Sequence, residues 1–251
     1  MNKKVLRLLL LAVCILVLLA IGLPWFFYPE DEVLRDLIAG TFPRLAVAMI
    51  LMFLMDHRGF GGVLKVKWKG RDLLWSIPCF LVAVVNFPFT ALIGGAAVIE
   101  HTRLIPLFLV KCVSIALLEE IFFRGLLLPL AFERFEKHPQ GILLSVVTTS
   151  AIFSLMHILN LFFGAGFGAT ALQLGYTFFL GCMFAVMFFR TKNIWLCVLV
   201  HALFDVGGTI VTDLGSGLFQ DLTFWILTAT VGVLCTVYIL FTLRKLMKKV
   251  D

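Results

Sequence analysis

The sequence predicts an all-α protein, a polytopic bundle of about eight transmembrane helices with both termini in the cytoplasm. Of its 251 residues, 61% are hydrophobic and only 14% are charged, whereas soluble domains carry roughly 45–50% apolar and about 25% charged residues. The mean hydropathy of +1.06 and the 26 Phe residues point the same way. These values predict a multi-pass integral protein of the cell membrane, with lipid as its surroundings.

The length allows one compact bundle and no separate soluble domain, so residues 1–251 are interpreted as a single integral membrane domain. A span needs about 20 mostly apolar residues. The first candidate could also be a secretory signal peptide, but it is long and has no clear small-x-small cleavage site, which favours an uncleaved span. The candidate spans lie at about 5–27, 39–56, 73–98, 104–132, 141–163, 168–190, 194–213 and 221–243.

Lys and Arg indicate the orientation, because they are enriched in cytoplasmic connections. Most of them lie near the two ends and in the connections around 57–72, 134–137 and 190–192. The alternate connections hold only Arg35, Arg44 and Arg103 as basic residues. Both termini are therefore expected in the cytoplasm. Because topology explains the net charge of +6, no basic face is left for nucleic acid, and no such partner is expected.

A short set of ionisable residues lies inside the candidate spans. On insertion scales, Asp, Lys or Arg at a helix centre costs about 2.5–3.5 kcal/mol, so such residues are rare and usually functional. Lys111 is interpreted as structural, since it lies near the outer end of its span and can snorkel to the interface. The set is Lys111, Glu119, Glu120, Arg124, His157, His201 and Asp205.

The stretch "LLEEIFFRG" places two glutamates and an arginine on one helix. Glu120 and Arg124 are four residues apart, so they share a face and can pair. Glu119 points roughly 100° away from Glu120 and has no charge partner on its own helix. A buried ion pair that locks the bundle would explain Glu120 and Arg124 but not Glu119. A carboxylate in this position is suited to accept a proton.

Two further stretches, "FSLMH" and "HALFD", each place a histidine one helical turn from a partner. They pair Phe153 with His157 and His201 with Asp205. A single membrane histidine is more often a packing residue than a catalyst. Two histidines on different spans, with Glu119 on a third, could surround one water molecule. This inventory is what general-base hydrolysis with oxyanion stabilisation needs.

Depth in the membrane fits this grouping only in part. If the fourth span stops near Gly125 and 126–136 lies along the interface, Glu119 and His201 both lie about 10 Å from the cytoplasmic boundary. His157, counted from residue 141, lies roughly 24 Å deep. If the three residues share one site, a tilt of this span or a later start of it must bring His157 to the depth of Glu119 and His201.

At these residues the chain resembles the CPBP family, the CAAX-protease and bacteriocin-processing (Abi) intramembrane endopeptidases, which includes the type II CAAX prenyl endopeptidase. The family pattern is E-E-x-x-x-R, then F-x-x-x-H, then H-x-x-x-N/D on successive core helices. All three motifs occur here in order, each within a candidate span. The resemblance covers roughly residues 104–213, interpreted as the catalytic core, and the flanking spans match only in being hydrophobic.

The resemblance implies a cavity open to the cytoplasm and hydrolysis of peptide bonds inside it. Glu119 would be the general base, and His157 would help to activate the water. His201 and Asp205 would stabilise the oxyanion. The residues that would support the site are Glu120, Arg124 and Phe153.

Asp205 stands where Asn is the family's better-known residue, and two roles remain open for it. Ionised, Asp205 would accept a proton from His201 and orient its ring, as carboxylates do for catalytic imidazoles. Protonated, it would donate a hydrogen bond to the oxyanion, as an Asn amide does.

No cofactor is expected, although the family has also been described as metalloproteases. Glu119, His157 and His201 could bind zinc with water in the fourth position. The chain has neither H-E-x-x-H nor C-x-x-C, and its six cysteines stand singly within the spans. We therefore favour a metal-free mechanism in which the glutamate activates water.

The expected partners are membrane lipid and a peptide or protein substrate at the cytoplasmic membrane face. Short loops are typical of a prokaryotic chain, which favours leader peptides, peptide pheromones or membrane-protein tails over prenylated CAAX proteins. One alternative is a transporter or proton relay, since intramembrane Glu, His and Asp also form proton paths. It is disfavoured because no inverted repeat relates the two halves. Another alternative is a catalytically idle protein that holds a peptide.

Overall fold

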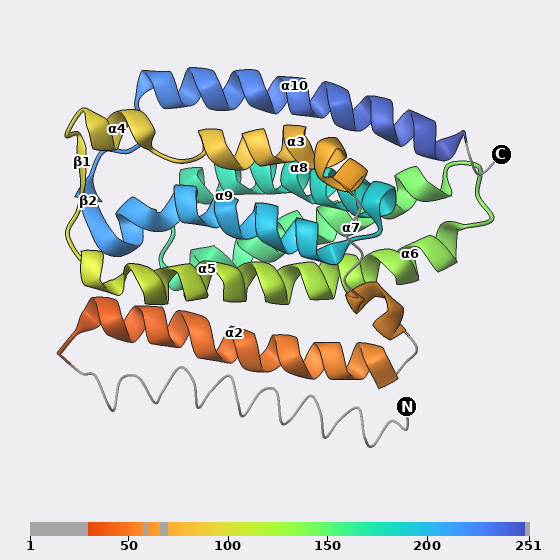
Figure 1. Ribbon diagram of the computed structural model, residues 1–251, viewed down its shortest axis with the longest axis horizontal. Helices are drawn as coiled ribbons and strands as arrows, with labels where there is room; N and C mark the ends of the chain where they lie inside the picture. Colours follow the sequence, from red (N-terminus) through yellow and green to blue (C-terminus); the bar gives the residue numbers. More distant parts are fainter. Residues whose placement is uncertain (1–29, 58–59, 66–69, 249–251) are drawn as a thin grey trace.

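The computed structural model describes residues 30–57, 60–65 and 70–248, which form a bundle of long helices lying side by side (Figure 1). The candidate span at 5–27 lies outside the described residues. In chain order the elements are α2 (Glu32–His57), η1 (Phe60–Leu64), α3 (Gly70–Val85), α4 (Phe89–Ile93), β1 (Ala97–Ile99), η2 (Thr102–Leu104), α5 (Ile105–Glu120), η3 (Ile121–Leu127), α6 (Leu128–Phe135), α7 (Gly141–Met156), η4 (His157–Phe163), α8 (Phe167–Thr191), α9 (Ile194–Leu214), β2 (Gly215–Gly217) and α10 (Leu222–Met247).

The helices α5 and α9 occupy the middle of the bundle. From bottom to top in Figure 1, α2 packs on α5, α5 on α9, α9 on α3, and α3 on α10. The helices α7 and α8 pack against each other behind this row, and α8 also contacts α3 and α10. The expected all-α bundle is therefore confirmed. Helix α5 and the following η3 carry the E-E-x-x-x-R motif, and α9 carries the H-x-x-x-D motif.

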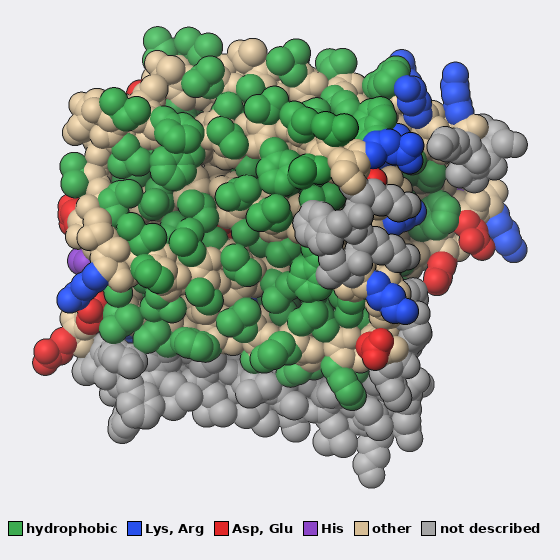
Figure 2. Space-filling view, viewed as in Figure 1, with side chains coloured by type: hydrophobic (Ala, Val, Ile, Leu, Met, Phe, Trp, Pro, Cys, Tyr) green, Lys and Arg blue, Asp and Glu red, His purple; other side chains and the backbone are tan. Residues whose placement is uncertain are grey.

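Among the residues that the structure describes, five helices are long and apolar enough to cross a membrane: Glu32–Asp56, Gly141–Phe162, Phe167–Thr191, Ile194–Leu214 and Leu222–Met247. Figure 2 shows apolar side chains covering the face between the two ends of the bundle. On this face most Lys and Arg side chains gather at the right-hand end, beside the carboxyl end of α10. The protein is a multi-pass integral membrane protein, while the number of spans and the cytoplasmic termini stay predictions.

The candidate span at 73–98 is wrong as one continuous helix. Helix α3 ends at Val85, and α4 and β1 follow as short separate elements. Pro88 accounts for the break, because proline has no amide hydrogen and also restricts the residue before it. The strand β1 then pairs antiparallel with β2, with Ala97 opposite Gly217. A hydropathy window averages over such a break and does not detect it.

The end of α3 is fixed against α9 near the third motif. The side-chain amide of Asn86 donates to the backbone carbonyl of Phe204, with 2.7 Å between Nδ2 and O. A Cβ atom at Gly207 would lie only 2.8 Å from the backbone carbonyl of Asn86. Glycine is therefore required at this crossing. The contact fixes α9 immediately beside Asp205.

The candidate span at 104–132 is one helical run that continues to Phe135, with a π-helical segment, η3, in its middle. The helix itself does not end near Gly125, the point at which the depth estimate from the sequence let the span stop. Pro129 lacks the amide hydrogen that would bond to the Gly125 carbonyl in a regular α-helix, which loosens the pattern there. Single π turns inside α-helices occur frequently at functional sites. Here the π turn begins directly after Glu120.

Candidate active site

Glu120 and Arg124 form the predicted ion pair, and it lies in the interior. Glu120 is 0% exposed and Arg124 2%. Arg124 Nη1 donates to Glu120 Oε1 at 2.9 Å. Arg124 Nη2 donates to the backbone carbonyl of Gly181 at 3.2 Å, which ties this helix to α8. Each charge therefore has a partner, which a buried ion needs to be tolerated.

Three aromatic rings surround the Arg124 guanidinium. Its Cζ lies 4.7 Å from the ring centroid of Phe153, 5.1 Å from that of Phe184 and 5.8 Å from that of Phe123. Cations are attracted to the electron-rich faces of such rings, and more strongly where water is excluded. Phe153, the first residue of the second motif, therefore contacts the ion pair of the first motif.

His201 is held by Glu120 and not by Asp205. The imidazole Nδ1 lies 2.8 Å from Glu120 Oε1. Because an ionised carboxylate only accepts, Nδ1 is the donor in this bond. The ring also stacks on Phe184, with centroids 5.1 Å apart and planes inclined by 19°. The orienting role that the sequence left open for Asp205 is thus occupied by a carboxylate on another helix.

The other ring nitrogen of His201 faces two carboxylates. Nε2 lies 3.7 Å from Glu119 Oε2 and 3.7 Å from Asp205 Oδ1. These distances are too long for hydrogen bonds but short enough for a strong electrostatic interaction. The Glu119 side chain is 29% exposed and that of Asp205 17%. Asp205 Oδ2 is itself buried and has no hydrogen-bond partner among the described residues.

His157 is not in direct contact with this cluster among the described residues. Its Nδ1 lies 3.0 Å from the backbone carbonyl of Phe153. Its ring meets the Phe153 ring edge-on with 5.2 Å between centroids, and the Phe153 ring lies 6.2 Å from that of His201. The structure therefore brings Glu119, His201 and Asp205 together, while His157 contacts Phe153, whose ring also contacts His201.

A second ion pair lies further along the same helices, and the sequence analysis missed it. Lys111 Nζ lies 2.8 Å from Asp213 Oδ2, with side chains 18% and 19% exposed. Lys111 thus pairs with α9 near the end of that helix, which agrees with the structural role expected for it, while the snorkelling of its side chain to the interface stays a prediction. One signal was present in the sequence: His201, Asp205, Thr209 and Asp213 recur every four residues, which predicts one polar stripe along a helix.

The described residues include no group of three or more His, Cys, Asp or Glu side chains that could hold a metal ion. The zinc ligands considered from the sequence were Glu119, His157 and His201. The Phe153 ring contacts both His157 and His201. Glu119, His157 and His201, the alternative zinc ligands from the sequence, are therefore not grouped here as the ligands of one metal ion.

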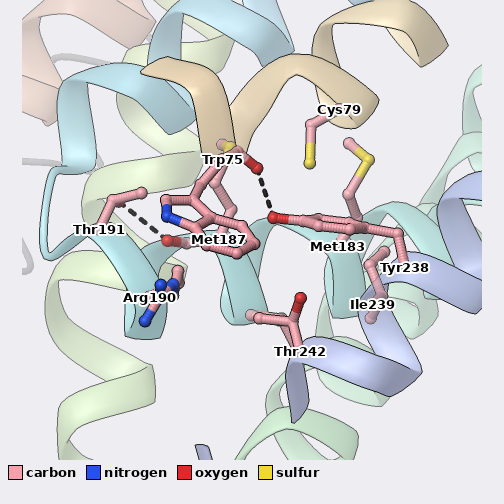
Figure 3. Close-up of a pocket in the computed structure, with 10 residues that line it drawn as sticks. Trp75, Cys79, Met183, Met187, Arg190, Thr191, Tyr238, Ile239 and Thr242 are labelled. Atoms are coloured by element: carbon pink, nitrogen blue, oxygen red, sulfur yellow. Dashed lines mark hydrogen bonds between the residues drawn. The ribbon is translucent and has the colours of Figure 1, made fainter. Parts of the chain in front are cut away.

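A small cavity lies away from these motifs, between α3, α8 and α10 (Figure 3). The Arg190 guanidinium lies 4.3 Å from the Trp75 ring centroid, and Tyr238 donates to the Trp75 carbonyl. Trp, Tyr and Arg together are typical of a membrane–water interface. We therefore interpret these residues as an anchor for this end of the bundle.

The fold and the site define a class of protein: a helical membrane protein with a buried carboxylate–imidazole centre. Residues 101–207 match the family model described as Rce1-like, "Type II CAAX prenyl endopeptidase Rce1-like". This match agrees with the family expected from the three motifs, and over these residues the chain is similar to it. The family is one of membrane proteases. Searches of curated proteins and of solved structures found no match.

The Glu120–Arg124 pair yields a stability prediction. Arg124→Ala leaves Glu120 buried without its guanidinium partner, which costs about 3–5 kcal/mol. The variant should therefore give less folded protein and a lower melting temperature in detergent than the wild type.

The matched control is the double variant Glu120→Gln with Arg124→Gln, which removes both charges and leaves an amide oxygen for His201. It should recover part of the lost stability. An Arg124→Ala protein that melts like the wild type would contradict the structural role of the pair.

Proposed function

We propose that the protein is an intramembrane endopeptidase in which Glu119 activates a water molecule. The observation that carries this proposal is the arrangement around His201. Glu120 holds Nδ1 at 2.8 Å, and Glu119 and Asp205 each lie 3.7 Å from Nε2. The match of residues 101–207 to the model of a family of membrane proteases supports the same proposal.

Glu119 is the general base in this proposal. It is the more exposed of the two adjacent glutamates, with 29% against 0% for the Glu120 side chain. As water attacks the carbonyl carbon of the scissile peptide bond, Glu119 takes up a proton from the water. When the tetrahedral intermediate collapses, the carbon–nitrogen bond breaks and Glu119 returns the proton to the leaving amine. The two products are a carboxylate and an amine.

His201 and Asp205 face the developing oxyanion in this mechanism. With a proton on both ring nitrogens, His201 donates from Nε2 to the oxyanion while Nδ1 stays bound to Glu120. Asp205 in its protonated form supplies a second donor, and Oδ2 has no hydrogen-bond partner among the described residues. His157, whose ring contacts Phe153, orders the water or the peptide.

The substrate class follows from the family and from the membrane setting. We propose peptide or protein substrates that reach the site from the cytoplasmic face of the cell membrane, either CAAX-like carboxyl-terminal tails or leader peptides. Comparative peptidomics of membranes from wild-type and Glu119→Gln cells tests this directly. An uncut precursor that accumulates in the variant identifies the substrate. A change in transport with unchanged peptides would favour a transporter instead.

The first prediction concerns Glu119→Gln, which is nearly isosteric and removes the base. Its 3.7 Å contact with His201 is not a hydrogen bond, so the fold should persist and the protein should purify normally. Cleavage of a farnesylated CAAX peptide, or of the precursor found by peptidomics, should fall by at least about 10²-fold in liposomes. Turnover near that of the wild type would refute the mechanism.

The second prediction concerns metal. The proposed mechanism assigns no step to a metal ion, so the purified enzyme should keep its activity after prolonged treatment with a membrane-permeant chelator. Metal analysis of the same preparation provides the control. Stoichiometric zinc, with activity lost on chelation and restored by zinc, would contradict the metal-free proposal.

The third prediction separates the two roles of Asp205. An amide can donate a hydrogen bond as a protonated acid does, but it cannot carry a negative charge. Asp205→Asn should therefore keep most of the activity, while Asp205→Ala should lose about 10²–10³-fold, the usual effect of removing one oxyanion donor.

The same peptide assay, run from pH 5.5 to 8.5, compares both Asp205 variants with the wild type. Higher activity of Asp205→Asn than of the wild type at high pH would support the donor role, because an amide does not ionise. If Asp205→Asn is as inactive as Asp205→Ala, the ionised form of Asp205 is the one that catalysis requires.

A further inference from the structure

Asn86 is a buried polar side chain that the proposed mechanism does not use. It follows the last residue of α3 directly and is only 7% exposed. A buried amide in a membrane protein needs hydrogen-bond partners, because neither lipid nor apolar side chains offer any. The Asn86 amide nitrogen Nδ2 finds one on another helix, at 2.7 Å from the carbonyl oxygen of Phe204 in α9.

The carbonyl that Asn86 binds belongs to the peptide unit between Phe204 and Asp205. Helix α9 runs unbroken from Ile194 to Leu214, so in a regular helix this carbonyl also accepts from the amide four residues later. A carbonyl oxygen has two lone pairs and can accept both bonds. Asn86 therefore holds α9 at the peptide unit of Asp205 without interrupting the helix.

Two adjacent glycines of α9 make room for this contact. A Cβ atom at Gly207 would lie 2.8 Å from the backbone carbonyl of Asn86, and one at Gly208 would lie 2.9 Å from Asn86 Nδ2. Cβ atoms do not approach other atoms so closely. A side chain at either position would therefore displace the end of α3. Both the close approach of the backbones and the amide bond meet α9 within three residues of Asp205.

The Asp205 carboxyl group depends on this backbone for its position. Its Oδ1 lies 3.7 Å from His201 Nε2, which is too long for a hydrogen bond. Its Oδ2 is buried and has no hydrogen-bond partner within the part of the chain that the structure describes. The His201 ring, in contrast, is held by Glu120 and by the stacked ring of Phe184. A small movement of α9 would thus displace the Asp205 carboxyl group without any side-chain bond to resist it.

We propose that Asn86 is a positioning residue, which holds the Phe204 carbonyl and thereby keeps the Asp205 carboxyl group beside His201 for the reaction. The inference rests on the proposed role of Asp205 at the oxyanion. Asn86 acts through the backbone of α9 and touches none of the reacting atoms.

The first test is Asn86→Leu in the full-length protein, assayed in liposomes with the cleaved peptide of the preceding section. Leucine keeps the volume of the side chain and removes the donor. A displacement of about 1 Å at a reacting group can cost about 10²-fold in rate, so kcat should fall by about tenfold to a hundredfold while KM stays unchanged. A change confined to KM would overturn the proposal.

Gly208→Ala tests the same contact from the other helix. The added methyl group would meet the Asn86 amide, so this variant should also lower kcat with KM unchanged. Unchanged kcat in both variants would contradict the positioning role.

Ser76→Ala is the matched control. Ser76 is also a buried polar residue of α3, with 0% exposure, but its hydroxyl donates to the Asp72 carbonyl of its own helix at 2.8 Å. The variant removes one buried hydrogen bond from α3 and none from α9, so kcat should stay unchanged. Equal losses of kcat in Ser76→Ala and Asn86→Leu would show a general weakening of α3 and would overturn the proposal.

A double-mutant cycle with Asp205→Ala tests whether Asn86 acts through Asp205. Asn86→Leu should lower kcat in the wild type and cause no further fall when Asp205 is already alanine. The same fall in both backgrounds would refute a role through Asp205.

A second measurement does not depend on cleavage. Solid-state NMR of isotope-labelled protein in liposomes, at one fixed pH, follows the carboxyl-carbon signal of Asp205, which is identified by its absence in Asp205→Ala. The signal should shift or broaden in Asn86→Leu and stay unchanged in Ser76→Ala. An unmoved signal in Asn86→Leu would overturn the positioning role, whatever the activity. A moved signal in a protein whose Asp205→Ala variant keeps full turnover would refute the catalytic role of Asp205 and leave the positioning by Asn86 intact.

Discussion

The two hydrogen bonds that Glu120 Oε1 accepts, from Arg124 and from His201, are the interaction on which the site depends. A carboxylate that is 0% exposed in a membrane bundle needs compensation for its lost solvation. Here that compensation comes from two different helical runs, so satisfying one charge also fixes α5 against α9. The stacked ring of Phe184 then leaves the His201 imidazole a single orientation.

Two irregular parts of the backbone lie near this centre. The π turn begins immediately after Glu120, and the broken end of α3 crosses α9 at Gly207, two residues after Asp205. Regular helices alone would repeat their side chains along parallel stripes. The π turn changes the register of the residues that follow, and the crossing at Gly207 brings a backbone close enough to fix α9. The precision of the site therefore depends on backbone features that composition does not reveal.

The sequence predicted contacts between residues on the same helix and missed contacts between different helices. Residues four apart on a helix meet, so the Glu120–Arg124 pair was predictable, and so was the shared face of His201 and Asp205. The hydrogen bond from His201 to Glu120 joins residues 81 positions apart and required the packing of α5 on α9. Arg44 was counted with the connections although it lies inside the predicted span at 39–56, and α2 begins seven residues before that span, at Glu32. The first of the predicted spans, at 5–27, lies outside the described residues.

Glu119 and Glu120 have the same chemistry, and helical geometry alone gives them different environments. Consecutive residues on an α-helix point roughly 100° apart. One of them therefore meets the guanidinium and the imidazole Nδ1 inside the core, while the other lies beside Nε2 with 29% of its side chain exposed. A buried carboxylate with two donors is a poor proton acceptor, because protonation would cost both charge-assisted bonds. A partly exposed carboxylate with no such bonds gives up little on protonation. Hence Glu120 is suited to hold the imidazole and Glu119 to exchange a proton with water, and their adjacency on one helix places both carboxylates beside the same imidazole.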